Sequence, residues 1–242
     1  MILCGFDVET TGLEIGVISV VECGLVLWDT ELHSPVKVAG YLVDPGSEAI
    51  WEPGVIEKHN ITPEMCFKYG TSELAALKQV LSWVHLADAV VAHNGTAFDY
   101  PVLQHWAKKH NLDWESGKTW IDTNCDLYPN QRPTTLTHLA ADHGFLNPFS
   151  HRASFDVVTM LKILDCYNIP HILEVAKSPT LTIQAIVDYA NNDKARALHY
   201  RAEYKNEKFQ YWGKTIRACY LEQEREAARL IGFDIEIIKT KV

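Results

Sequence analysis

The chain has 242 residues, of which 47% are hydrophobic and 22% charged, and its formal net charge is −9. This composition fits a globular protein with one sizeable core, or one domain plus a smaller second one. It contains no apolar run of the roughly 20 residues that a membrane span needs. We expect no signal peptide, because the first predicted strand begins almost at once, and six scattered cysteines predict a cytoplasmic protein.

Charge is divided unevenly along the chain. Residues 177–242 hold 12 Lys and Arg against 9 Asp and Glu, a net charge of +3, whereas residues 1–176 hold 10 against 22, a net charge of −12. The change of sign predicts two units with different surfaces. We therefore expect one domain over 1–176 and a small C-terminal α+β accessory domain over 177–242. The acidic domain still suits a polyanionic substrate if its carboxylates bind metal ions, which invert the local electrostatics.

The first predicted strand ends in acidic residues. Residues 2–6 are apolar and β-prone, and Asp7, Glu9 and Thr10 follow directly. Side chains at i and i+2 of a strand share one face, so Asp7 and Glu9 point the same way. Two adjacent carboxylates resist joint ionisation unless a cation lies between them. A polar strand end that faces water is the alternative interpretation.

The next elements alternate between strand and helix patterns. Strands are predicted at 17–29, 36–45, 88–94 and 120–124, and helices at 71–85, 97–110, 136–144 and 152–168. The order βββαβαβαα predicts an α/β fold with a mixed β-sheet, whose first three strands form a meander. After the Asn168-Ile169-Pro170 break, residues 195–240 predict a strand, a turn at 205–208, a second strand, a helix and a third strand.

Three further polar positions stand at the ends of these elements. Asp99 lies at the start of the helix at 97–110, and His151 and Asp156 lie five residues apart at the start of the long helix. Such ends converge at one edge of an α/β sheet. Gathered carboxylates provide hard oxygen ligands, which suit Mg²⁺ or Mn²⁺ better than zinc.

Three segments carry a family resemblance. FDVETTG (6–12), HNGTAFD (93–99) and HRASFD (151–156) resemble, in order and separation, the three motifs of the DnaQ-like DEDDh 3′→5′ exonucleases. The resemblance covers roughly residues 1–168 and implies an RNase H-like mixed β-sheet flanked by helices. The second segment has one residue more before Phe98 than the frequent H-N-A-x-F-D spacing. Some branches of the family share this longer form.

The resemblance also implies catalytic roles. Phosphodiester hydrolysis needs a deprotonated water, neutralised phosphoryl oxygens and a stabilised leaving oxyanion, and two divalent ions about 4 Å apart can supply all three. Asp7, Glu9 and Asp156 would ligate the ion that holds the water, Asp7 would bridge to the second ion, and Asp99 would complete the cluster. His151 would be the general base, because an imidazole accepts protons near neutral pH.

Substrate contacts are implied at four more positions. Thr10, Leu13 and Phe98 match family positions that contact the terminal nucleotide, and His59 would contact the nucleotide by analogy. Core packing is the alternative for Leu13 and Phe98, and a plain exposed loop histidine is the alternative for His59. Glu22, between apolar residues of its strand, is given at most a supporting role.

The C-terminal hairpin suggests a binding surface. Trp212, with Arg201, Lys205 and Lys214, would form a platform where bases stack and phosphates pair. The alternative is that these aromatic residues form a small core against the following helix.

Together these features predict a metal-dependent 3′→5′ exonuclease acting on DNA 3′ ends, preferably single-stranded, and releasing nucleoside 5′-monophosphates. An RNA-trimming exonuclease, a proofreading subunit docked to a polymerase and an inactive nucleic-acid-binding module are the alternatives. Nucleic acid is the expected partner, with no membrane; a protein partner or a homodimer stays open.

Overall fold

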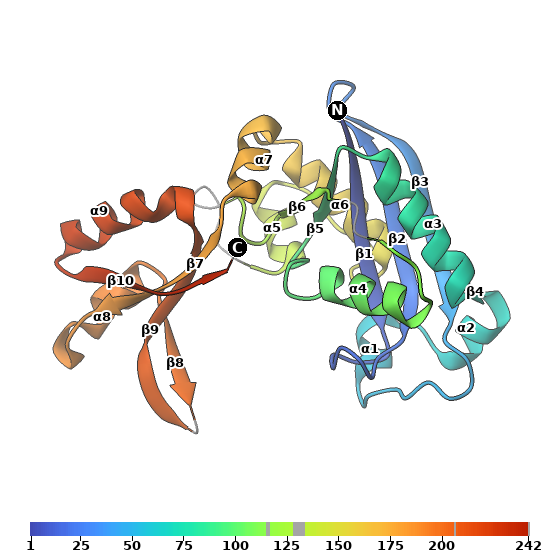
Figure 1. The fold of residues 1–242 in the computed structure, drawn as a ribbon, viewed down its shortest axis with the longest axis horizontal. Helices are drawn as coiled ribbons and strands as arrows, with labels where there is room; N and C mark the ends of the chain where they lie inside the picture. Colours follow the sequence, from blue (N-terminus) through green and yellow to red (C-terminus); the bar gives the residue numbers. More distant parts are fainter. Residues whose placement is uncertain (115–116, 128–133, 206, 242) are drawn as a thin grey trace. The chain divides into compact units, whose positions relative to one another are not determined.

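The computed structural model describes residues 1–114, 117–127, 134–205 and 207–241 (Figure 1). The chain forms two compact units, Met1–Leu173 and Glu174–Val242. The sequence predicts a domain boundary between residues 176 and 177. That the segments on either side fold independently stays a prediction. In the part of the chain that the structure describes, no helix combines the length and apolar character needed to cross a membrane.

The first unit contains a six-stranded mixed sheet in the order β4-β3-β2-β1-β5-β6. The first three strands form an antiparallel meander, and β5 and β6 run parallel to β1. The strands are β1 (Ile2–Thr10), β2 (Val20–Asp29), β3 (Ser34–Asp44), β4 (Thr71–Ser72), β5 (Ala89–Ala92) and β6 (Thr119–Asp122). The predicted RNase H-like mixed sheet with its meander is confirmed.

Helices cover both faces of this sheet. In Figure 1, α3 and α4 lie over one face and α6 over the other. The helices are α1 (Val55–His59), α2 (Pro63–Tyr69), α3 (Glu73–Leu86), α4 (Asp99–Lys109), α5 (Leu136–Asp142), α6 (Ala153–Leu164) and α7 (Ile169–Lys177). The α7 helix occupies the segment that the sequence suggested as a break, because Pro170 lies in its first turn, where a missing backbone N–H costs little.

Alternation along β1 decides where its carboxylates point. Cys4, Phe6 and Val8 are buried in the core beneath α3 and α4. Odd-numbered residues of the strand therefore face α6, and Gly5 lies directly under that helix: a Cβ at this position would come within 2.5 Å of Val157 Cγ1. Asp7 continues this face towards the end of the strand.

A second glycine brings the start of α6 onto the sheet. Gly24 of β2 pairs with Asp7 of β1. A Cβ at Gly24 would lie 2.3 Å from the carbonyl carbon of Ala153, the first residue of α6. The helix start can lie this close only because residue 24 has no side chain. The close approach brings the residues around the helix start next to the carboxylates of β1.

The outer edge of the sheet is only partly covered. Within the described residues, β4 pairs with β3 at Val43 and Asp44. Further along β3, the side chains of Val36 and Val38 are 60% and 51% exposed.

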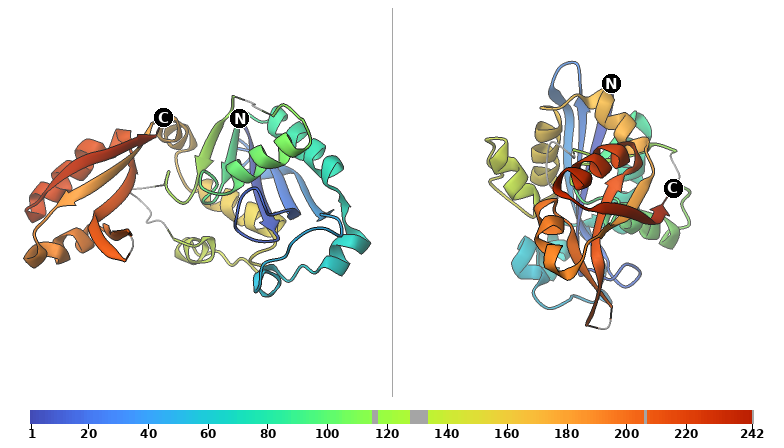
Figure 2. Two further views of the ribbon diagram at one scale, coloured as in Figure 1. Left: turned by 60° about the horizontal axis from the view of Figure 1, so that its bottom comes forward. Right: turned by 90° about the vertical axis from the view of Figure 1, so that its left-hand side faces the viewer.

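The second unit is a four-stranded antiparallel sheet in the order β10-β7-β9-β8. Figure 2 shows α9 (red) lying along this sheet, and its Ala228 enters the core of the unit. The elements are β7 (Thr180–Ile186), the 3₁₀ turns at Tyr189–Asn191 and Ala218–Tyr220, α8 (Asn192–Ala197), β8 (Arg201–Lys205), β9 (Lys208–Arg217), α9 (Leu221–Ile231) and β10 (Asp234–Lys241). The predicted strand–strand–helix–strand order is confirmed in β8, β9, α9 and β10, but residues 195–197, predicted as the start of the first strand, belong to α8. The expected turn includes Asn206, which lies outside the described residues.

Candidate active site

Asp7 lies at the centre of the acidic residues. Its residue surface is partly accessible, yet its Oδ2 atom is buried and accepts no hydrogen bond from the residues that the structure describes. A buried carboxylate oxygen without a donor is costly in a folded protein unless something cationic meets it.

Asp99 is the first residue of α4 and is 2% exposed. Its Oδ1 accepts a hydrogen bond from the backbone N–H of Val8 at 3.2 Å, which ties the start of the helix to β1 between Asp7 and Glu9. This bond between the Asp99 carboxylate and the Val8 backbone joins the second motif directly to the first.

The loop before Asp99 is held by an aspartate that the sequence analysis did not select. Asp122, 2% exposed at the end of β6, accepts from the N–H groups of Asn94 at 2.8 Å and Asn124 at 3.0 Å. It also accepts from the backbone N–H and the hydroxyl of Thr96, at 3.1 and 2.7 Å. A carboxylate directly after the apolar Trp120-Ile121 pair was the sequence signal for this role. These hydrogen bonds hold the conformation of the second motif, which has one residue more before Phe98 than the frequent spacing.

His151 and Asp156 meet Glu9 at the start of α6. One ligand atom from each of these three residues lies within 4.8 Å of the others. The Asp156 carboxylate accepts from the His151 backbone N–H at 3.0 Å and from the Asn147 side-chain amide. His151 has a φ of 62°, a left-handed conformation that is rare outside glycine and that turns the chain sharply before the helix.

An ion pair fastens this turn to the sheet. Glu22 of β2 is 5% exposed and accepts from the Arg152 guanidinium at 2.7 Å (Nη2) and 3.1 Å (Nε). The other Glu22 oxygen accepts from the backbone N–H of Ala153 at 2.9 Å. Glu22 thereby binds the residue after His151 and the first residue of α6.

The carboxylates of the site resist joint ionisation. Burial, and then the charges of Asp99 and Glu9, raises the pKa of Asp7 well above its ordinary value. Burial, followed by Asp156, raises the pKa of Glu9 to about 8. Burial raises the pKa of Asp99 to about 7 and also raises that of Asp156. A donor set of hard oxygens, with a buried oxygen lacking a donor, fits a divalent cation.

Three residues expected to contact substrate lie around the end of β1. Thr10 is buried and its hydroxyl donates to the Gly12 carbonyl at 2.6 Å. Leu13 is 69% exposed, and its backbone N–H donates to Glu52 Oε1 at 3.0 Å. Phe98 is partly buried against the core. Leu13 is therefore free to meet a ligand, whereas Thr10 shapes the loop.

His59 has a structural position instead of the expected surface one. It is 1% exposed. Its Nδ1 accepts from the Ile61 N–H at 3.0 Å, so Nε2 carries the proton and donates to the Thr10 carbonyl at 3.3 Å. Burial lowers its pKa. Both nitrogens are used inside the protein, so the expected nucleotide contact does not fit this geometry.

Trp212 is likewise placed in a core. It is 7% exposed, packs with Ile183 and Ala185, and its indole N–H donates to Asn192 Oδ1 at 2.7 Å. Lys214 pairs with Glu224 at 2.8 Å. The alternative of a small aromatic core fits the structure, and the expected stacking platform on Trp212 does not. The side chain of Lys205 lies outside the described residues.

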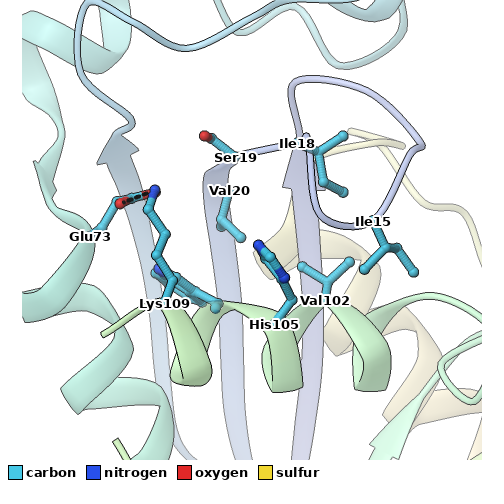
Figure 3. Close-up of a pocket in the computed structure, with 9 residues that line it drawn as sticks. Ile15, Ile18, Ser19, Val20, Glu73, Val102, His105 and Lys109 are labelled. Carbon is cyan, nitrogen blue, oxygen red and sulfur yellow. Dashed lines mark hydrogen bonds and ion pairs between the residues drawn. The ribbon is translucent and has the colours of Figure 1, made fainter. Parts of the chain in front are cut away.

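A small pocket lies beside the site, between the β1–β2 loop and α4 (Figure 3). Ile15 and Ile18 of the loop face Val102 and His105 of the helix, and the Glu73–Lys109 ion pair, 2.7 Å long, spans its other side. None of the clustered carboxylates lines this pocket. The residues around it instead support the β1–β2 loop.

Comparisons with known proteins agree with this arrangement. The exonuclease family (RNase_T) matches residues 4–164, most of the first unit. The chain belongs to this family, among its DnaQ-like DEDDh members. The chain is also 28% identical, over 172 residues, to the PolC-type DNA polymerase III of Mycoplasma pneumoniae; the match covers 67% of this chain and 11% of that protein.

Two solved structures share the fold. Exonuclease I of E. coli, in complex with a dA16 oligonucleotide, superposes with a TM-score of 0.69 at 14% identity, covering 96% of this chain and 68% of that one. The nuclease domain of 3′hExo, a DEDDh family member bound to rAMP, gives a TM-score of 0.57 at 18% identity, covering 68% of this chain and 90% of that one.

Proposed function

We propose that the protein is a divalent-metal-dependent 3′→5′ exonuclease that acts on single-stranded DNA ends and releases nucleoside 5′-monophosphates. The buried Oδ2 of Asp7 carries this proposal: it accepts no hydrogen bond from the described residues and lies among the charges of Asp99, Glu9, Asp156 and Glu22. The surroundings of Asp7 raise its pKa, so the cluster is incomplete without positive charge.

Each residue of the site then has a task. Asp7, Glu9, Asp99 and Asp156 would hold two Mg²⁺ or Mn²⁺ ions. When bound, such ions activate a water and neutralise the phosphoryl oxygens. His151 accepts the proton of the attacking water, and its sharp turn aims the ring at Glu9 and Asp156.

The choice of DNA rests on the relatives. E. coli exonuclease I was solved with dA16 and dT13 oligonucleotides, which supports a single DNA strand as the substrate. The 3′hExo domain was solved with rAMP, which favours RNA as the second candidate. The PolC relative supports a role beside a polymerase, with the protein partner still to be found. Like the predicted cytoplasmic location, these are proposals.

The test is a digestion series. Purified protein is incubated with 5′-labelled single-stranded DNA, blunt duplex DNA and single-stranded RNA, each with Mg²⁺, Mn²⁺ or EDTA. We expect a ladder of strands shortened from the 3′ end on single-stranded DNA, monophosphate products and no reaction in EDTA. Faster degradation of RNA than of DNA would replace the DNA proposal by the second candidate.

Two variants test the residue roles. Asp7→Ala should lower kcat by several orders of magnitude, because the ions lose their central ligand. His151→Ala should lower kcat about 10²–10⁴-fold, the usual scale of general base catalysis, while divalent-ion binding measured by calorimetry persists. Near wild-type digestion by Asp7→Ala would show that the site is assigned wrongly.

A further inference from the structure

Two phenylalanines flank the candidate active site. Phe155 directly precedes Asp156 on α6, and Phe149 lies two residues before His151. Their rings lie in contact, with centroids 4.7 Å apart and planes inclined by 57°. Phe149 is 56% exposed and Phe155 44%, so much of the pair faces solvent. Burying these ring surfaces against a ligand would be favourable, so the pair is a candidate binding surface.

The pair is anchored to the same groups as the catalytic residues. The backbone N–H of Phe149 donates to Asn147 Oδ1 at 3.2 Å, and the Asn147 amide donates to Asp156. The backbone N–H of Phe155 donates to the Arg152 carbonyl at 2.9 Å, and Arg152 is held by Glu22. Short chains of hydrogen bonds therefore connect the backbone that carries both rings to the carboxylates of Asp156 and Glu22.

The surrounding charge selects the kind of ligand. Asp156 directly follows Phe155 and belongs with Glu9 to the acidic cluster. These carboxylates repel the phosphates of a nucleic acid wherever cations do not neutralise them. An aromatic ring attracts the neutral face of a nucleobase whatever that charge, and each stacked base contributes about 1–3 kcal/mol of binding free energy. A neutral stacking surface thus holds a strand at an acidic site without adding cations to the cluster.

We propose that Phe149 and Phe155 form a stacking surface for nucleobases within the last four nucleotides of the strand whose 3′ end lies at the acidic cluster. This inference rests on the proposed function and adds to it how the substrate is held. Stacking requires unpaired bases, so the surface also favours a single strand over a duplex.

Binding of a 5′-fluorescent single-stranded 12-mer, followed by anisotropy, tests the proposal. All proteins carry Asp7→Asn, which suppresses hydrolysis during the measurement. Adding Phe149→Ala and Phe155→Ala should weaken binding about 5- to 150-fold, the loss expected for one stacked base. The matched control is Phe67→Ala with Tyr69→Ala, an exposed aromatic pair on α2 with 81% and 65% exposure, which should leave affinity unchanged.

Abasic substrates identify the contact. Removing the base at each of the last four positions should weaken binding to the reference protein at one or two adjacent positions. At those positions, removal of the base should not weaken binding to the Phe149→Ala, Phe155→Ala variant any further. Two results would overturn the proposal. One is that the alanine variant binds an oligonucleotide lacking these four bases more weakly than the reference protein does, by the same factor as for the intact oligonucleotide. The other is that the variant binds the intact oligonucleotide with unchanged affinity.

Two further measurements separate stacking from other contacts. The slope of log affinity against log salt should stay the same in the variant, because no phosphate contact is removed. Phe149→Leu with Phe155→Leu keeps apolar area without a ring face and should bind as weakly as the alanine variant; full binding would overturn stacking. Base-dependent binding without any hydrolysis in the digestion series would reject the proposed function and leave this surface standing.

Discussion

At the scale of single residues, Asp7 couples stability to function. The structure places its Oδ2 without a donor among the described residues, close to other carboxylates. This carboxylate, proposed above to bind metal, is therefore expected to destabilise the metal-free protein. We expect Asp7→Asn to raise the Tm of the metal-free protein at pH 8, because the amide removes a charge from the cluster. Differential scanning calorimetry in EDTA measures this.

The pH dependence follows from the same residues. Folding raises the pKa of Glu9 to about 8 and of Asp99 to about 7, both above their ordinary values near 4. Between about pH 4 and pH 8 the native state then binds more protons than the unfolded state, so the free energy of unfolding falls as pH rises. In EDTA, the free energy of unfolding of the Asp7→Asn variant should decrease less steeply as pH rises. Identical pH profiles of Tm for both proteins would contradict the electrostatic explanation.

Arg152 is expected to position the His151 turn without touching substrate. Arg152→Ala leaves the buried Glu22 carboxylate with fewer donors, which costs about 1–3 kcal/mol of stability. It also releases the turn, so kcat should fall about tenfold or more, and Arg152→Lys should restore part of it. Steady-state digestion and thermal unfolding are measured on each variant.

The matched control for Arg152 is another ion pair of the same unit. Lys109 lies 2.7 Å from Glu73 and is 45% exposed at its side chain, compared with 35% for Arg152. Lys109→Ala should affect stability but leave kcat as it is. If both alanine variants lower kcat in proportion to their loss of stability, the positioning role of Arg152 is refuted.

At the scale of elements, the seating of α6 on the sheet depends on the glycines beneath it. A Cβ at Gly24 would meet the Ala153 backbone at 2.3 Å, whereas one at the paired Gly40 would meet the Ser154 hydroxyl at 2.1 Å. A side chain can rotate away and a backbone cannot. Gly24→Ala should therefore cost about 1–3 kcal/mol and lower kcat, and Gly40→Ala clearly less. Chemical denaturation and digestion rates test the difference; equal costs would contradict it.

The elements also show what the sequence could predict. Period-2 and helical patterns identified the meander and the long helices, because each is determined by local burial. The exposed stacking position expected for Trp212 of β9 was wrong. The ladder shifts register between Glu203 and Tyr204, so Trp212 faces Ala202 and the core. A shift of one residue exchanges the two faces of a strand. The unrecognised β7 completes that core on the other side of β9.

At the scale of the whole molecule, only part of the candidate site could be predicted from the sequence. The D-x-E pair and the spacing of His151 from Asp156 are local, so both could be predicted from the sequence. Glu22 and Arg152 lie 130 positions apart, so their contact exists only once the sheet and α6 are assembled. His59 was misplaced because nothing in its own segment indicates that it packs against the end of β1.

The two units invite a test of their division of work. A chain that ends at Lys177 keeps the first unit with its own core and the acidic cluster, and should hydrolyse a trinucleotide at the rate of the full chain. It should bind a long single strand more weakly and with a smaller salt dependence, because the removed residues 178–242 hold 11 Lys and Arg against 9 Asp and Glu, a net charge of +2. Anisotropy at several salt concentrations measures this. Equal affinity of both chains for the long strand would contradict the binding role of the second unit.

Among the residues that the structure describes, the edge of β3 pairs with β4 at Val43 and Asp44 only, which has a consequence for how the protein behaves at high concentration. An open strand with exposed Val36 and Val38 is a template on which further strands can add, the first step towards aggregation. The same segment limits that risk: Pro35 has no N–H to offer a neighbouring strand, and Lys37 places a charge over the Trp83 ring, 4.4 Å from its centre. Pro35 and Lys37, far from the acidic cluster, are thus expected to limit aggregation of the protein.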